Sequence, residues 1–394
     1  MPEDKKLSRN VLLLGVSSFL TDLSSEMIFP ILPLFLVNIL HADVSVVGLI
    51  DGVAESTADL GKMVSGWISD KMGKRKPFIV AGYSLSSFSK PLFALARIWP
   101  HVLVVRFLER VGKGLRGTAR DAMVAEETTH ENRGKAFGYR KMMDQFGAVL
   151  GPLAAFLLMP YLTNHMEPSD AYRTLFWISF IPAILAVIIL YFVKEKAQAM
   201  VMEKKTTLSV ALGPRFKKFL AITLVFAFGM FTYSFLILKA QEVGVEVGVI
   251  PLLYLCYNLS FLFFAMPVGT SADKIGRKKT LAIGYLIFAL TCIGLIKATT
   301  AFHVWLTFIL YGVFMAIMET VQRAYISDIV SPEVRGTALG LHQGAAGFAA
   351  LPANVIVGFL WSRYNSTVAF TYSLAVSLVA VVLLASLIRE KKKT

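Results

Sequence analysis

Charged residues and cysteines are both scarce in this chain. Asp, Glu, Lys and Arg make up 17% of its 394 residues, against roughly 25% in soluble domains, and 56% of the residues are hydrophobic. The only two cysteines, Cys256 and Cys292, both lie in apolar runs, which excludes a disulfide framework and favours small buried residues. The composition argues against a soluble globular protein and indicates membrane-spanning helices.

The patterns that mark common chemistry are missing as well. The six histidines have no metal-ligand spacing, and the chain has no nucleotide-binding glycine loop and no nucleophile–base pattern. We therefore expect no enzyme, no metal and no cofactor, and no direct use of ATP. The charged start Met1–Asn10 leads into a long apolar run without a small-residue cleavage site, so we expect no cleavable signal peptide.

What the chain does have is a series of long apolar segments. Each is close to the roughly 20 residues that a helix needs to cross a bilayer. Twelve spans are predicted, at about 11–40, 44–69, 77–98, 100–125, 134–160, 171–193, 216–240, 246–271, 279–299, 302–328, 336–361 and 366–388. The one long polar connector, 194–214, separates an N-terminal bundle of six helices (1–193) from a C-terminal one (215–394). The expected fold is an all-α membrane protein.

The net charge of +14 has a topological explanation. Basic residues crowd every second connection between the spans, whereas the opposite connections are short and poor in Lys and Arg. The positive-inside rule then predicts that both termini are cytoplasmic, in a multi-pass protein of a prokaryotic cytoplasmic (inner) membrane. Because the positive charge follows the loops, we do not expect nucleic-acid binding.

One loop pattern occurs twice, 203 positions apart, each time between two apolar runs. The first copy runs from Gly66 through Asp70 and Gly73, and the second from Gly269 through Asp273 and Gly276, each followed by basic residues. Glycine allows close helix approach, and an aspartate can lie at a helix N-terminus, so the loop suits a contact that breaks and reforms. We predict a conformational latch formed by Gly66, Asp70, Gly73, Arg75, Asp273, Gly276 and Arg277.

This repeated loop resembles the best-known signature of the major facilitator superfamily, G-x-x-x-D-[RK]-x-G-[RK]-[RK]. Two further signatures of that family resemble Arg106–Gly114 in the fourth span and the helix-crossing motif Gly147-x-x-x-Gly151-Pro152 in the fifth. The resemblance implies two pseudo-symmetric six-helix bundles and transport by alternating access. In the family the fifth-span pattern accompanies exporting antiporters. The fourth-span pattern departs from the family at Glu109, Arg110 and Lys113, which puts drug specificity in doubt.

Charged residues inside the spans are costly unless they are paired or hydrated, so they mark candidate sites. The first span carries Asp22 and Glu26 one turn apart, and the basic residues of the fourth span follow helical spacing. The predicted substrate cavity comprises Glu55, Glu109, Arg110, Lys113, Arg116, Glu319, Arg323 and His342. The alternative is a static network of salt bridges. A kink is expected at Lys90-Pro91, with the lysine reaching toward the membrane surface.

The resemblance also implies proton coupling, because the family ties the arginine that corresponds to Arg106 to an acid of the first span. Glu26 is expected at similar depth to Arg106, and Asp22 about a turn deeper, nearer Lys113. We predict Asp22 and Glu26 as proton carriers, Arg106 as their modulator and Asp59 as the next candidate.

The predicted function is proton-coupled efflux (antiport) of a small organic solute. The alternative is proton-coupled uptake of an anionic metabolite or a metal-chelate siderophore. Because the fourth span is basic, the expected substrate is anionic or zwitterionic in either direction. Protons and the lipid bilayer are the other expected partners, and a monomer suffices. A non-transporting sensor would lack the charged interior, and a lipid flippase would favour an apolar cleft.

Overall fold

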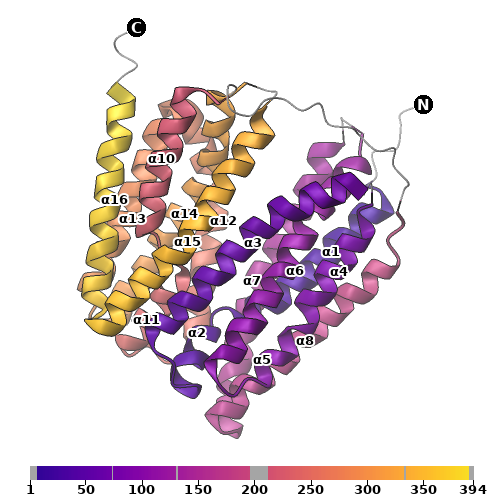
Figure 1. The fold of residues 1–394 in the computed structure, drawn as a ribbon. Helices are drawn as coiled ribbons and strands as arrows, with labels where there is room; N and C mark the ends of the chain where they lie inside the picture. The colour runs from indigo at the N-terminus through magenta and orange to yellow at the C-terminus, as the bar shows by residue number, and fades with distance from the viewer. Residues whose placement is uncertain (1–6, 73, 130–131, 196–211, 332–333, 390–394) are drawn as a thin grey trace. The chain divides into compact units, whose positions relative to one another are not determined.

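The computed structural model describes residues 7–72, 74–129, 132–195, 212–331 and 334–389. Every regular element over these residues is a helix, as Figure 1 shows. The helices group into the twelve predicted spans across this part of the chain, which confirms the predicted all-α membrane fold. The bounds differ from the predicted ones by only a few residues at most ends. Most of the predicted connector, 196–211, lies outside the described residues.

The chain forms two compact units. The first comprises residues 1–40 and 57–203, and the second comprises 41–56 and 204–394. The first unit contains α1 (Arg9–Ile28), α2 (Leu32–Leu34), a π-helical turn η1 (Phe35–Ile39), α4 (Lys76–Phe88), α5 (Lys90–Ala94), α6 (Trp99–Glu126), α7 (Arg133–His165) and α8 (Pro168–Tyr191). The long helix α3 (Val44–Met72) begins in the second unit and ends in the first. The predicted boundaries of the two bundles stay a prediction.

The second unit contains the remaining helices. They are α10 (Pro214–Gly229), α11 (Tyr233–Glu242), α12 (Ile250–Ile275), α13 (Arg277–Lys297), α14 (Ala301–Ile329), α15 (Arg335–Arg363) and α16 (Ser366–Arg389). Aromatic rings fill its core. Phe226 stacks on Tyr285 with ring centroids 3.9 Å apart, and Phe288 and Phe314 pack around this pair. This half of the chain therefore packs mainly through apolar contacts.

Nine of the helical segments in the described part of the chain have the length and apolar composition of a membrane span. Three spans of the N-terminal half fall outside this group: α3, the pair α4 and α5, and α6. Helix α4 has 13 residues, and charged side chains interrupt both α3 and α6. Of these three spans, α3 and α6 carry predicted site residues, including Asp59 on α3 and Arg106 on α6.

Three spans are interrupted, and proline accounts for two of the breaks. Pro30 lies in the turn after α1, and Pro91 lies in the first turn of α5, directly after the break at Ser89. Proline has no N–H and cannot continue the hydrogen bonding of the preceding helix. The third break, Met230–Thr232 between α10 and α11, has no proline. Side chains bond its backbone instead: Tyr311 donates to the Phe231 carbonyl, and Thr232 N donates to Asn354 Oδ1.

Glycine pairs allow α4 and α6 to pack at short range. A Cβ atom on Gly112 would lie 2.6 Å from the Gly82 carbonyl oxygen and 2.8 Å from Ser86 N. A Cβ atom on Gly82 would lie 2.6 Å from the Gly112 carbonyl oxygen, so each glycine makes room for the other. This contact positions α6, the helix with the most buried charge, against α4.

We expect Gly112→Ala to destabilise the protein by about 1–3 kcal/mol, because the added methyl group overlaps backbone atoms that belong to a packed helix. Thermal unfolding of the purified protein in detergent measures the effect. The matched control is Gly138→Ala on α7, where a Cβ atom would meet nothing within 4 Å. Since alanine is the better helix former, the control is expected to be neutral or slightly stabilising. Equal melting temperatures for the two variants would contradict the close contact.

Candidate functional site

A cluster of buried charges lies on α6. Four charged residues of this helix are at most 4% exposed: Arg106, Glu109, Arg110 and Arg116. Glu109 Oε2 pairs with Arg106 Nη1 at 2.9 Å and with Arg110 Nε at 3.4 Å. Both guanidinium groups lie over the ring of Phe29, at 4.3 and 5.2 Å from its centroid. One carboxylate thus bridges two arginines around an aromatic ring.

This cluster has hydrogen-bonding capacity that the described residues do not use. Arg106 Nε, Glu109 Oε1 and Arg116 Nη1 are buried and have no hydrogen-bond partner in the described structure. The Arg116 guanidinium stacks on Tyr83, 4.8 Å from the ring centroid. Buried polar atoms without partners are uncommon and need an explanation. A bound anion could take up the arginine donors.

The two acids of α1 lie directly against the glycines of α7. A Cβ atom on Gly147 would lie 2.8 Å from Asp22 Cβ, and one on Gly151 would lie 2.5 Å from Glu26 Cβ. The helix-crossing motif therefore presses α7 onto α1 at the two carboxylates, and Pro152 follows inside α7. The motif has a packing function in this fold, and that function fixes the positions of Asp22 and Glu26.

The charges of α6 and α7 surround Asp22. Lys113, Arg116 and Arg120 act on it as positive charges, and Asp144 acts as a negative one. For Arg106, the predicted modulator, the ion pair in the structure is with Glu109, three residues further along α6. Sequence reasoning directed Arg106 toward Glu26 and overlooked this pairing within one helix.

The predicted residues of α3 do not form a single cluster. Asp59 pairs with Lys62 on the same helix at 2.8 Å, and both side chains are partly exposed. Glu55 lies in the part of α3 that belongs to the second unit, where its charge and that of Asp51 act on Tyr311. In the same part, Thr232 Oγ1 donates to Asp51 Oδ2 at 2.6 Å. Asp51 was not among the predicted site residues.

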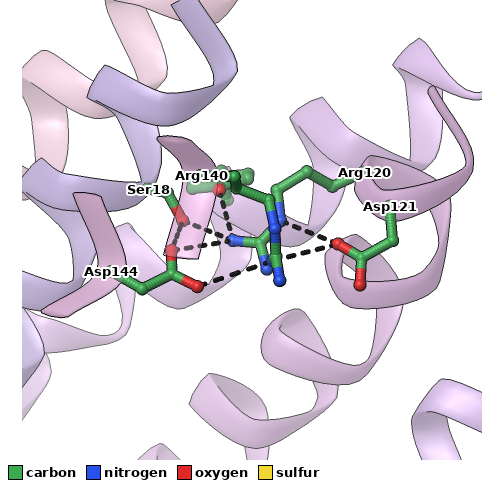
Figure 2. A network of polar contacts seen from close by, with 6 residues as sticks. Ser18, Arg120, Asp121, Arg140 and Asp144 are labelled. Carbon is green, nitrogen blue, oxygen red and sulfur yellow. Dashed lines mark hydrogen bonds and ion pairs between the residues drawn. The ribbon is translucent and has the colours of Figure 1, made fainter. Parts of the chain in front are cut away.

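A second polar network joins four helices of the first unit, and Figure 2 shows its four charged residues together with Ser18. Arg140 Nη1 lies 3.0 Å from Asp121 Oδ1 and 3.5 Å from Asp144 Oδ2. Arg120 pairs with Asp121 at 3.4 Å and with Asp144 at 3.8 Å, and it also donates to the hydroxyls of Ser18 and Tyr83. Ser18 in turn donates to Asp144 at 2.5 Å.

Sequence reasoning missed this network as a unit. Its members come from α1, α4, α6 and α7, and the positions of the helices relative to one another decide which side chains meet. One signal was present, because Arg140 and Asp144 have the i, i+4 spacing of a helical ion pair. The charges of its two arginines and two aspartates cancel, so the network suits a structural junction between these helices.

The predicted residues of the C-terminal half are more exposed. Glu319 and Arg323 form an i, i+4 pair at 3.2 Å, with side chains 47% and 65% exposed. His342 stacks on Phe219, with ring centroids 6.2 Å apart. Both residues were predicted as members of the substrate cavity, and their i, i+4 spacing is a signal for the ion pair, whereas the aromatic contact of His342 had no sequence signal.

The predicted latch is described for four of its seven residues. Arg75 Nε pairs with Glu126 at 3.1 Å, and Arg277 Nη1 pairs with Asp328 at 2.7 Å. In both cases 51 residues separate the partners, and the acid lies at the end of α6 or next to the end of α14. Asp273 pairs with Arg277 at 3.3 Å.

The second loop of the predicted latch also shows why one of its positions is a glycine. Gly276 has φ of +95°, a conformation that favours glycine, and it separates α12 from α13. Gly73 and the side-chain positions of Gly66 and Asp70 lie outside the described residues. The repeated loop pattern aligns Arg75 with Lys278. The ion pair that corresponds to that of Arg75 is instead made by Arg277, so the two loops differ by one residue in the position of the paired base.

Comparison with known proteins shows a match over the whole chain. The family model described as Major Facilitator Superfamily matches residues 14–239 and 219–394. An uncharacterised MFS-type transporter of Methanocaldococcus jannaschii is 37% identical over 390 residues, which are 97% of this chain and 95% of the relative. The cis,cis-muconate transport protein of Acinetobacter baylyi is 24% identical over 356 residues, which are 84% of this chain and 83% of that protein.

Solved structures show the same fold. The crystal structure of a D-xylose–proton symporter superposes with a TM-score of 0.77 at 17% identity, covering 95% of this chain and 96% of that chain.

We expect Asp144→Asn to destabilise the protein by about 1–3 kcal/mol, because it leaves Arg120 and Arg140 with Asp121 as their shared acid in the network of Figure 2. The estimate stays below the value for a fully buried pair because the side chain of Asp144 is 17% exposed. Thermal unfolding in detergent measures the loss. Glu319→Gln is the control, since its ion pair is exposed and is expected to contribute less than about 0.5 kcal/mol. A larger effect in the control would rule out the network as a structural junction.

Proposed function

Because the chain belongs to the major facilitator superfamily and is a membrane transporter rather than an enzyme, we propose that it moves a small organic anion together with protons. The observation that carries this proposal is the buried cluster of Arg106, Glu109 and Arg110. Its single carboxylate faces two arginines, and donors next to it have no partner among the described residues. An anion would supply both the missing charge and the missing hydrogen-bond acceptors.

The charge balance of the first unit supports an anionic substrate. Between Arg106 and Arg116, helix α6 carries four bases and one acid, and α1 contributes only Asp22 and Glu26 in return. These four bases outnumber the three acids, so a carboxylate ligand fits this environment. The similarity to a cis,cis-muconate transport protein points the same way, since muconate is a dicarboxylate.

Proton coupling follows from the same electrostatics. When Asp22 or Glu26 takes up a proton, the surroundings of the basic cluster lose a negative charge, which strengthens the binding of an anion. By thermodynamic reciprocity the bound anion then strengthens proton binding. Proton and anion therefore favour each other, as symport requires. Arg106 modulates this exchange, and Asp59, which is paired with Lys62, is the next candidate carrier.

Efflux by antiport is the second candidate. The motif formed by Gly147, Gly151 and Pro152 favours it, since its pattern accompanies export in the superfamily. Antiport requires proton and solute to compete, which suits a cationic or zwitterionic solute that binds to ionised Asp22 and Glu26. The packing function of the two glycines against α1 explains the motif without reference to direction. We therefore rank the anion symporter first.

The decisive test of coupling is Glu26→Gln, in which the side chain cannot release a proton. In proteoliposomes with cis,cis-muconate as the probe, we expect the wild type to accumulate the anion when the outside is acidified. The variant is expected to exchange the anion at equal concentrations and to lose the accumulation driven by the gradient. Glu167→Gln, at an exposed position just before α8, is the control and should behave as wild type. Unimpaired accumulation in Glu26→Gln would refute this assignment.

Thermal unfolding with a ligand panel separates the two candidate functions. A ligand that binds the folded state stabilises it by mass action and so raises the melting temperature. At a concentration 100 times its dissociation constant, the ligand adds about 2.7 kcal/mol to the free energy of unfolding. We expect organic anions or metal-chelate siderophores to stabilise the protein, more so at low pH. Stabilisation by lipophilic cations instead, stronger at high pH, would favour antiport.

A further inference from the structure

One buried lysine has no assigned function in this scheme. Lys90 is the first residue of α5, directly after the break that ends α4, and it is 1% exposed. The expected kink is present, but the expectation that the lysine reaches toward the membrane surface is wrong. The break turns the side chain into the first unit, toward α1.

The hydrogen bonds of Lys90 all go to neutral oxygens. Its Nζ atom donates to Ser24 Oγ at 2.6 Å and to the Thr21 carbonyl oxygen at 3.3 Å. The Ser24 hydroxyl donates its own proton to the Ser179 carbonyl oxygen, so the serine accepts from the lysine. Neutral acceptors compensate a buried ammonium group less well than a carboxylate does.

The chain contains a second buried lysine for comparison. Lys239 of α11 is 5% exposed, and its Nζ atom lies 2.7 Å from Glu242 Oε1 and 3.2 Å from Ser366 Oγ. A carboxylate in direct contact compensates the charge of Lys239. Both lysines are buried, and they differ in the nature of the acceptor.

Charged groups nevertheless surround Lys90 at longer range. Glu109 and Arg116 on α6 and Asp22 and Glu26 on α1 act on its charge. The other helices in contact with α5 contribute Arg173 of α8, which donates to the Ala94 carbonyl, and Tyr83 of α4, which accepts from Arg120.

We propose that Lys90 exchanges a proton with the carboxylates of Asp22 and Glu26 during the transport cycle. The N–H bond of the ammonium group breaks, nitrogen keeps the electron pair, and an O–H bond forms on a carboxylate, so the total charge is unchanged. This inference rests on the proposed proton coupling and adds a base to its acids.

The first experiment observes the lysine directly and needs no substrate. Protein labelled with 15N at the lysine side chains is reconstituted in lipid, and nuclear magnetic resonance distinguishes ammonium from amine. Lys90→Met and Lys90→Arg each assign the Lys90 signal by its loss, and Lys239→Arg assigns the control. We expect an amine signal for Lys90 within the pH range in which exposed lysines remain ammonium groups, and Lys239, which is paired with Glu242, is the control. An ammonium signal for Lys90 throughout would overturn the proposal.

The second experiment connects the proton to transport. Lys90→Arg keeps a positive charge but cannot release its proton. With cis,cis-muconate in proteoliposomes, we expect it to exchange the anion and to lose at least about tenfold in accumulation driven by a pH gradient. Wild-type accumulation in this variant would overturn the proposal. Failure of the wild type to accumulate the anion would instead contradict the proposed function. The 15N signal of Lys90, which is measured without substrate, would then be the test of proton exchange at this lysine.

Discussion

The central constraint on this protein is the cost of charge inside a membrane. The first unit buries arginine, glutamate and lysine at positions that a lipid-facing helix would not tolerate, and each requires a partner within the unit. The packing of α1, α4, α6 and α7 follows from this requirement. Glu109 bridges two arginines of its own helix, and Asp144 with Asp121 balances two more arginines on α6 and α7. The charged residues on α3 and α6 also explain why these two helices fall outside the group of nine apolar spans in the described part of the chain.

Close helix contact is what makes this matching possible. Glycines on α7 bring the backbone of α1 within van der Waals distance, so that Asp22 and Glu26 lie at fixed depth beside the basic helix. Gly82 and Gly112 bring α4 against α6 in the same way, and this contact positions Tyr83 under Arg116. A side chain at any of these glycines would overlap atoms of the facing helix and push the two helices apart. Small residues here are therefore part of the electrostatic design.

The sequence predicted the fold well, since hydrophobic length and loop charge are local properties. Twelve spans, the position of the breaks at proline and the i, i+4 pair of Glu319 and Arg323 could all be read directly. The partners of Arg106, Arg120 and Lys90 could not. They depend on how far each helix is rotated about its axis and on where it crosses its neighbours, and neither has a signal in one sequence. The break at Met230–Thr232 was also missed, because side chains from distant helices bond its backbone.

The two halves of the duplication have diverged in an informative way. Each keeps an arginine after the loop glycine that pairs with an acid 51 residues further on, so the loop contact has been retained twice. The core of the second unit is by contrast largely aromatic, with Phe226, Tyr285 and Phe288 packed together. We propose that both halves need this loop contact for movement. Under the proposed proton coupling, one set of titrating groups is enough for the cycle, which accounts for the second pattern.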